Sequence, residues 1–329
     1  MATTQLTSTA HGHAYLHADL QAEDDVIAGL SAPHKRLPCR LLYDAAGANL
    51  FERITTVDEY YPTRTELDLL KRHLPQIAAQ VGPRARVIEP GSGEGIKPRM
   101  LLSALDQPSA YVPIDVAHEQ LQAWARAIRA EMPGLDVTPV TADYTRGFDV
   151  PTPQHDWGTS LVFFPGSTIG NFEPAEARNF LSMLGRVAGD QRMLLLGADA
   201  THDEDDLINA YDDSRGITAA FNKNVLAHLN KTRGATFDLD CFDHRAIWNE
   251  AASRIEMHLF SRCQQIVRID GHTIPFTADE SIVTEHCYKH SPEAMLAILA
   301  AGGWRPRQVF TAPDRPYRLW LCEPLTWRS

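Results

Sequence analysis

Apolar and polar positions alternate with two different periods between residues 65 and 200. A repeat of roughly 3.6 residues from Thr65 to Gly82 predicts an amphipathic helix that the glycine ends. Two more stretches with this repeat predict helices over 119–134 and 173–189. Short apolar runs predict strands within 85–90, 110–115, 136–144, 159–164 and 192–200, the third weakened by Pro139. Because strand and helix alternate at βαβ spacing, the sequence predicts a parallel, doubly wound α/β sheet.

The C-terminal part of the chain is expected to return to this sheet. A helix is predicted over 291–304, where Ser291 caps the start and Gly302-Gly303 end it. Residues 305–311 and 315–324 then predict two strands, joined by a turn at Pro313-Asp314. Two adjacent strands with so short a connection form an antiparallel hairpin.

The residues between the fifth strand and the last helix have a different pattern. Residues 202–230 are predicted to be helical, whereas 253–261 and 264–277 alternate like strands and Asp270-Gly271 is typical of a hairpin turn. A second, smaller α+β domain is therefore expected as an insertion, and the N-terminal 60 residues are expected to pack with it. The predicted boundaries are 64–201 and 289–329 for the sheet domain, 15–63 and 202–288 for the insertion, and 1–14 for a flexible end.

Composition narrows the classes of partner. The chain of 329 residues has a formal net charge of −11 and no run rich in Lys and Arg, which argues against nucleic acid. No apolar run approaches the roughly 20 residues of a membrane span, and no secretory pattern opens the chain. The five cysteines are scattered without a C-x-x-C pair, which argues against disulfides and zinc. We therefore expect a cytoplasmic protein and, without a coiled-coil signal, a monomer.

A glycine-rich turn follows the first predicted strand. Its sequence, EPGSGEG from Glu89 to Gly95, places a glycine at every second position. Glycines let the backbone turn tightly and approach a ligand, but this spacing differs from the G-x-G-x-x-G of a dinucleotide site. A carboxylate at Glu89 suits a cation, such as the amino group of a methionine moiety, better than a pyrophosphate.

Acids at the ends of the next two strands extend this pattern. Asp115 is placed to accept hydrogen bonds from ribose hydroxyls, and Asp143-Tyr144 to reach the exocyclic amine of an adenine. Together they favour S-adenosylmethionine over NAD. A plain tight turn and a helix-capping role for Asp115 are the structural alternatives, and an NAD-dependent oxidoreductase is the less favoured functional one.

The segment TEHCYKH, residues 284–290, gathers an acid, two histidines, a thiol and a phenol. Such a group is compatible with a metal site, with a nucleophile and its base, or with the wall of a substrate pocket. The rest of the sequence offers no Cys/His pair at ligand spacing, so we expect no metal.

Seven segments carry a resemblance to a known family. They are LLYDAAGANLFERIT, EYYPTRTE, IEPGSG, FFPGSTIGNF, AYDDSRGITAAFNKN, RIEMHL and TEHCYK. In these segments the chain resembles the histidine-specific methyltransferases, which trimethylate the α-amino group of L-histidine to hercynine in ergothioneine biosynthesis. The resemblance implies a class I S-adenosylmethionine-dependent methyltransferase domain, with a Rossmann-like sheet and a C-terminal antiparallel hairpin, and a smaller substrate-binding domain.

The resemblance also implies two sets of site residues. The cofactor set comprises Glu89, Gly91, Gly93, Lys97, Asp115, Asp143 and Tyr144. The histidine set comprises Tyr60, Asn171, Tyr211 and Glu285, with His286 and Cys287 beside them and Tyr43 and Met257 at pocket positions. From spacing alone, Tyr60 would be interpreted as a core aromatic, Asn171 as a turn residue and Met257 as packing.

Methyl transfer sets the chemical demands on these residues. The nucleophile is a neutral amine whose lone pair must point at the methyl group. Asn171, Tyr211 and Tyr43 can orient it without adding a negative charge that would hold its proton, and no general base is expected. Glu285 can accept an imidazole N–H, and Tyr60 can hold the other ring nitrogen.

Position 287 departs from the family pattern. Cys287 stands where the best-known members have serine, and a thiol is a weaker hydrogen-bonding group. Methylation of another small aromatic amino acid or amine is therefore the alternative function.

Overall fold

The computed structural model describes residues 25–93 and 95–325, which form two compact units. The large unit contains Thr55–Ala210, Trp248–Ile255 and the chain from Cys287 onward. The small unit contains residues 25–54, Tyr211–Ile247 and Glu256–His286.

This division differs from the expected boundaries at four places. Residues 55–63, 202–210, 248–255 and 287–288 belong to the large unit, although the sequence pattern places them with the insertion. A hydrogen bond from the Lys289 backbone N–H to the Ser253 carbonyl, 2.8 Å long, is one reason why 248–255 belongs there. The predicted flexible end, 1–14, lies outside the described residues.

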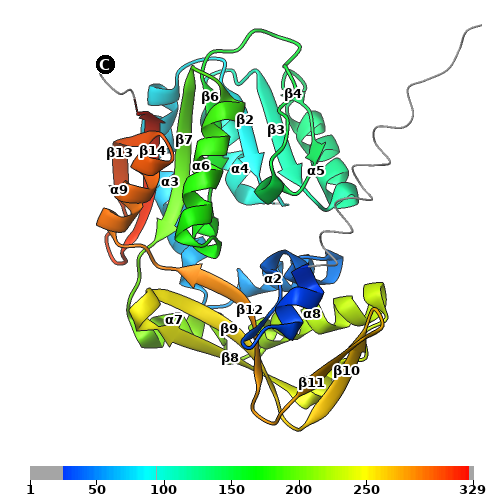
Figure 1. Cartoon of the computed structure of the whole chain (residues 1–329). Helices are drawn as coiled ribbons and strands as arrows, with labels where there is room; N and C mark the ends of the chain where they lie inside the picture. Colours follow the sequence, from blue (N-terminus) through cyan, green and yellow to red (C-terminus); the bar gives the residue numbers. More distant parts are fainter. Residues whose placement is uncertain (1–24, 94, 326–329) are drawn as a thin grey trace, which may run out of the picture. The chain divides into compact units, whose positions relative to one another are not determined.

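The large unit is built on an eight-stranded sheet (Figure 1) with the strand order β13-β14-β7-β6-β2-β3-β4, and β5 also pairs with β3. Parallel pairing joins β2 to its neighbours, with Ile88 opposite both Val112 and Val162. Strand β14 runs antiparallel to both of its neighbours in this sheet, β7 and β13. The predicted doubly wound sheet with a C-terminal antiparallel hairpin is therefore confirmed. Its strands are β2 (Arg86–Pro90), β3 (Ala110–Asp115), β4 (Asp136–Val137), β5 (Val140–Thr141), β6 (Ser160–Phe164), β7 (Arg192–Asp199), β13 (Trp304–Thr311) and β14 (Tyr317–Pro324).

Helices cover both faces of this sheet because its strands are apolar on both sides. Val87 and Leu161 belong to one buried cluster, whereas their chain neighbours Ile88 and Val162 belong to another. The first cluster includes residues of α3, α4 and α5, and the second includes residues of α6 and α9. The helices are α3 (Tyr61–Val81), α4 (Ile96–Ala104), α5 (His118–Glu131), α6 (Pro174–Ala188), α7 (Glu204–Tyr211) and α9 (Pro292–Ala301).

Two local features differ from the expected element bounds. Helix α3 begins at Tyr61, four residues before the predicted start, because Pro62 fits the first turn of a helix. The third predicted strand is split into β4 and β5, because Pro139 has no N–H to give to a sheet. Short 3-10 helices complete the described chain: η1 (Cys39–Leu42), η2 (Tyr144–Arg146), η3 (Thr168–Asn171), η4 (Leu239–Cys241) and η5 (Glu250–Ala252).

The small unit has a four-stranded sheet with the order β1-β12-β9-β8 and a separate β10-β11 hairpin (Figure 1). The predicted hairpin turn is present, with Asp270 and Gly271 both at positive φ. The N-terminal segment contributes β1, whose Lys35 pairs with Ile282 of β12 in parallel. The elements are β1 (Lys35–Arg36), α2 (Ala45–Ile54), α8 (Ile217–Arg233), β8 (Phe242–Asn249), β9 (Arg254–Ser261), β10 (Gln265–Ile269), β11 (His272–Phe276) and β12 (Ser281–Tyr288).

In the described part of the chain, no helix is both long enough and apolar enough to cross a bilayer.

Candidate active site

The glycine turn connects the end of β2 to α4 and is fixed to the end of β3. The backbone N–H groups of Gly91 and Ser92 both donate to the Ile114 carbonyl, at 2.8 and 3.1 Å. Gly91 has a φ of +68°, and a Cβ there would lie 3.1 Å from the Tyr144 ring. Glycine is needed at this position both for its φ and for the close approach of Tyr144. The structure therefore brings Gly91, Ser92 and Tyr144 together.

Glu89 is a buried carboxyl group at the start of this turn, with 2% of the residue exposed. It accepts a short hydrogen bond from the Tyr111 hydroxyl, which in turn accepts from Trp124 Nε1 at 3.1 Å. Burial raises the pKa of Glu89 to about 8, although Tyr111 and Lys97 oppose the shift. An acid in this state is protonated at neutral pH until a cation approaches it.

The two strand-end acids make local hydrogen bonds. Asp115 accepts from the Ala117 N–H at 3.0 Å and lies 3.4 Å from the Gly93 N–H. Asp143 accepts from the backbone N–H and the hydroxyl of Thr145, at 3.0 and 2.6 Å. Asp115 thus shapes the chain beside the glycine turn, and Asp143 caps η2. Asp115 does not cap α5 as the structural alternative had it, because the N-cap of this helix is Ala117. Such roles leave carboxylate lone pairs for a ligand.

Lys97 lies on α4, and its Nζ is 2.5 Å from Glu66 Oε2. Glu66 is a fully buried acid on α3 that also accepts from the Gly166 N–H, at 3.0 and 2.9 Å from its two oxygens. Sequence reasoning missed Glu66. The signal was present, because a carboxylate on the buried face of an amphipathic helix requires a partner.

Asn171 ends the loop that follows β6. The loop is anchored through Ser167, whose hydroxyl accepts from the Asp199 N–H at 3.0 Å. A Cβ on Gly170 would lie 2.6 Å from the Tyr288 carbonyl oxygen and 3.0 Å from Cys287 Sγ. Gly170, the residue before Asn171, therefore packs directly against Cys287 and Tyr288.

A buried ion pair lies behind Cys287. Lys289 Nζ is 3.0 Å from Asp199 Oδ2 and 3.5 Å from Cys287 Sγ, and the Tyr61 hydroxyl donates to Asp199 at 2.7 Å. Burial acts to raise the pKa of Asp199, but the Lys289 ammonium and the Tyr61 hydrogen bond outweigh it and hold this pKa below its usual range. Sequence reasoning selected Tyr60, which is buried at the N-cap of α3, and missed its neighbour Tyr61.

The other five predicted histidine contacts belong to the small unit. The Tyr43 ring packs edge-on against Phe51 and Phe221, with centroids 5.5 and 5.3 Å apart. Tyr211, Met257 and Glu285 are buried, and His286 is partly buried. Tyr60, Asn171 and Cys287 belong to the large unit.

Across residues 25–93 and 95–325, no three His, Cys, Asp or Glu side chains gather as metal ligands would. That the protein needs no metal ion remains a prediction.

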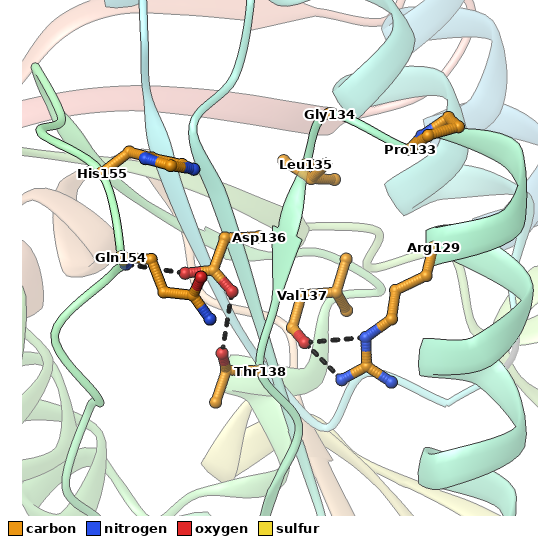
Figure 2. Close-up of a pocket in the computed structure, with 9 residues that line it drawn as sticks. All are labelled: Arg129, Pro133, Gly134, Leu135, Asp136, Val137, Thr138, Gln154 and His155. Atoms are coloured by element: carbon orange, nitrogen blue, oxygen red, sulfur yellow. Dashed lines mark hydrogen bonds between the residues drawn. The ribbon is translucent and has the colours of Figure 1, made fainter.

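A separate hollow of about 350 Å³ is lined by Arg129, Pro133, Gly134, Leu135, Asp136, Val137, Thr138, Gln154 and His155 (Figure 2). The hollow lies beside β4, which pairs with the first residues of β3, whereas the glycine turn lies beside the last residues of β3. It contains none of the predicted site residues.

The sequence is similar to those of known proteins. Residues 22–324 match the family described as "Histidine-specific methyltransferase, SAM-dependent". A "Histidine N-alpha-methyltransferase" from Mycolicibacterium smegmatis is 42% identical over 317 residues, which cover 94% of this chain and 97% of the relative. A protein of the same name from Mycobacterium tuberculosis is 40% identical and covers 85% of this chain and 87% of its own. The "Ergothioneine biosynthesis protein 1" of Neurospora crassa is 34% identical over 61% of this chain, which corresponds to 23% of that protein.

Proposed function

Because the chain belongs to the family of histidine-specific, S-adenosylmethionine-dependent methyltransferases, we propose that it methylates the α-amino group of L-histidine. The product is the trimethylated amino acid hercynine, the precursor that ergothioneine biosynthesis requires. The observation that carries the proposal is the match over nearly the whole chain, which includes both the cofactor turn and the insertion.

The residues of the glycine turn fit S-adenosylmethionine. The buried Ser92 hydroxyl oxygen has no hydrogen-bond partner among the described residues, and Tyr111 and Lys97 offset only part of the cost of burying the Glu89 anion. Glu89 would hold the α-ammonium group, Lys97 the carboxylate, Asp115 the ribose hydroxyls, and Asp143-Tyr144 the adenine. When bound, the cofactor supplies an electrophilic methyl group on a sulfonium.

The protein's contribution is to orient the amine in its neutral form. A free α-amino group is mostly protonated at neutral pH. Asn171, Tyr211 and Tyr43 offer an amide and two phenols, which can hold the amine without a negative charge that would stabilise its proton. The departing proton passes to water. Orientation is the larger contribution, because a reacting pair held in line avoids the entropy of a chance encounter.

Recognition of the imidazole is assigned to a carboxylate. Glu285 accepts a ring N–H and Tyr60 holds the second nitrogen, with Met257, His286 and Cys287 completing the wall. A site built to hydrogen-bond a ring nitrogen rejects rings without one, because its own buried groups would be left unpaired.

The decisive experiment is mass spectrometry of a reaction with histidine and S-adenosylmethionine. A gain of three methyl groups on the α-nitrogen supports the proposal. Isothermal titration in the presence of S-adenosylhomocysteine, with histidine, tryptophan and Nα-methylated histidines, ranks the substrates. Failure of histidine to bind would refute the proposed substrate, and methylation of tryptophan alone would favour the alternative. Thermal stabilisation by NADH and not by S-adenosylhomocysteine would refute the cofactor.

A further inference from the structure

A single buried amide contacts all three long strands of the small unit. Asn222 on α8 is 0% exposed. Its Nδ2 lies 2.8 Å from His244 Nδ1 on β8 and 3.2 Å from the His258 carbonyl oxygen on β9. Its Oδ1 accepts from the Thr284 hydroxyl on β12 at 2.6 Å. Both amide protons and the amide oxygen therefore have hydrogen-bond partners, so the buried Asn222 side chain is fully satisfied.

The partners fix how this amide is oriented. The His258 carbonyl can only accept, so the atom beside it must be the NH₂ group and not the oxygen. The second NH₂ proton then points at His244 Nδ1, which must be unprotonated. The proton of the neutral imidazole is consequently on Nε2. Burial lowers the pKa of His244, although the nearby Asp212 opposes the shift, and this favours the neutral ring.

The hydrogen-bond network centred on Asn222 reaches residues of the predicted histidine set through His244 and Thr284. The Nε2–H of His244 donates to the Tyr211 carbonyl at 2.9 Å. The Thr284 hydroxyl also lies 3.0 Å from the Met257 carbonyl, so it shares its one proton between two acceptors. Glu285 follows Thr284 on β12, and successive strand residues point to opposite faces. Thr284 faces the amide, and Glu285 projects from the other side.

Three of the family's sequence segments meet at this amide. Tyr211 and Asn222 lie in AYDDSRGITAAFNKN, Met257 lies in RIEMHL, and Thr284 and Glu285 lie in TEHCYK. A buried network in which every group is satisfied is rigid, and removal of its centre leaves several groups unpaired together. A small displacement of a binding group is enough to reduce activity strongly.

We propose that Asn222 is a positioning residue for the histidine-binding half of the site: acting through His244 and Thr284, it fixes Tyr211, Met257 and Glu285 without touching the substrate. The inference rests on the proposed function, since it concerns how that site is held.

The test compares two asparagines of the same helix. Asn230 also makes two hydrogen bonds, from its Nδ2 to the Phe237 carbonyl at 2.7 Å and from the Phe237 N–H at 2.9 Å. These contacts involve none of the predicted histidine set. Asn222→Ala is expected to raise the KM for histidine by about tenfold or more while the Kd for S-adenosylhomocysteine changes by less than about twofold. Asn230→Ala is expected to lower thermal stability and leave both constants unchanged.

A smaller change covers the case in which Asn222→Ala does not fold. Thr284→Val removes only the hydroxyl and is expected to raise the KM for histidine. Thr284→Ser keeps the hydroxyl, so its KM for histidine should equal that of the wild type. Unchanged histidine KM in Asn222→Ala or in Thr284→Val would overturn the positioning role, as would equal effects of Asn222→Ala and Asn230→Ala.

A readout without substrate separates this inference from the proposed function. The ring ¹⁵N shifts of His244 are expected to report the Nε2–H tautomer in the wild type and its loss in Asn222→Ala. If the wild type shows another tautomer, the network is wrong whatever the substrate. If the tautomer is as expected but the wild type does not methylate histidine, the proposed function is wrong and the network stands.

Discussion

At the scale of single residues, Glu89 carries a proton that a bound cation must displace. Because burial raises its pKa to about 8, the carboxyl is roughly 90% protonated at pH 7. A ligand ammonium stabilises the anion and so lowers this pKa. We predict that binding of S-adenosylhomocysteine at pH 7 releases close to one proton, and that its affinity rises as the pH increases towards 8.

Proton release is measured by isothermal titration in buffers with different ionisation enthalpies. Glu89→Gln keeps the size of the side chain and cannot titrate, so it should bind more weakly and release no proton. The same proton count in wild type and Glu89→Gln would show that another group is responsible.

Glu66 is expected to support cofactor binding through its contact with Lys97. It pairs with Lys97 and accepts from the Gly166 N–H while fully buried. Glu66→Gln keeps the shape but removes the charge and places an NH₂ group against an N–H or an ammonium. Since hydrogen bonds to charged groups contribute more than neutral ones, we expect the affinity for S-adenosylhomocysteine to fall about tenfold.

The matched control for Glu66 is an exposed ion pair of the same unit. Glu131 on α5 pairs with Arg99 at 2.8 Å, and both side chains are exposed. Exposed pairs contribute little, so Glu131→Gln should bind the cofactor normally. Titration of both folded variants decides, and equal affinities would contradict a role for Glu66.

At the scale of elements, the loop after β6 depends on a close approach to β12. A Cβ at Gly170 would overlap the Tyr288 carbonyl oxygen, which belongs to the backbone and cannot rotate away. We predict that Gly170→Ala lowers kcat/KM for histidine by about a hundredfold, because it displaces the segment that ends in Asn171. Overpacking should also lower stability, by about 1–3 kcal/mol.

Gly134 is the matched control for this element, because it has no atom within 4 Å of an added Cβ. Steady-state kinetics of Gly134→Ala should equal those of the wild type. If Gly170→Ala retains full activity, the contact between the loop and β12 does not position Asn171.

Local sequence patterns predicted the sheet because each of its strands carries its own signal. Val87 and Ile88, for example, face different clusters, so β2 is apolar throughout and bounded by turns. Strand β12 was not predicted, since its TEHCYK segment resembles a chemical cluster more than a strand. Lys289 and Asn222 were missed for another reason: their main partners, Asp199 for the first and His244 and Thr284 for the second, are distant in sequence, and only the folded chain brings them together.

At the scale of the whole molecule, acid stability is expected to depend on His290. Its ring stacks on Tyr288 with centroids 5.5 Å apart, and the buried Nε2 has no hydrogen-bond partner among the described residues. Burial lowers its pKa to about 4, from an ordinary value of 6.5. Between these two pH values only the unfolded chain takes up the proton, so the free energy of unfolding falls as the pH decreases, by about 3 kcal/mol at most.

Chemical denaturation between pH 4 and 7 measures this dependence. His290→Gln should flatten the curve, whereas His272→Gln, at an exposed position on β11, should leave its slope unchanged. Identical slopes in wild type and His290→Gln would place the acid sensitivity elsewhere.

The chain passes between the two units at five points, after residues 54, 210, 247, 255 and 286. Neither unit is a continuous piece of sequence, and β14, which lies between β7 and β13, follows both of these strands in the chain. On the ribosome, the eight-stranded sheet therefore stays open along β7 until β14 emerges. Strand edges left unpaired during synthesis invite aggregation. The sheet consequently closes late in synthesis, and neither unit, being assembled from separate segments, is a natural starting point for a smaller enzyme.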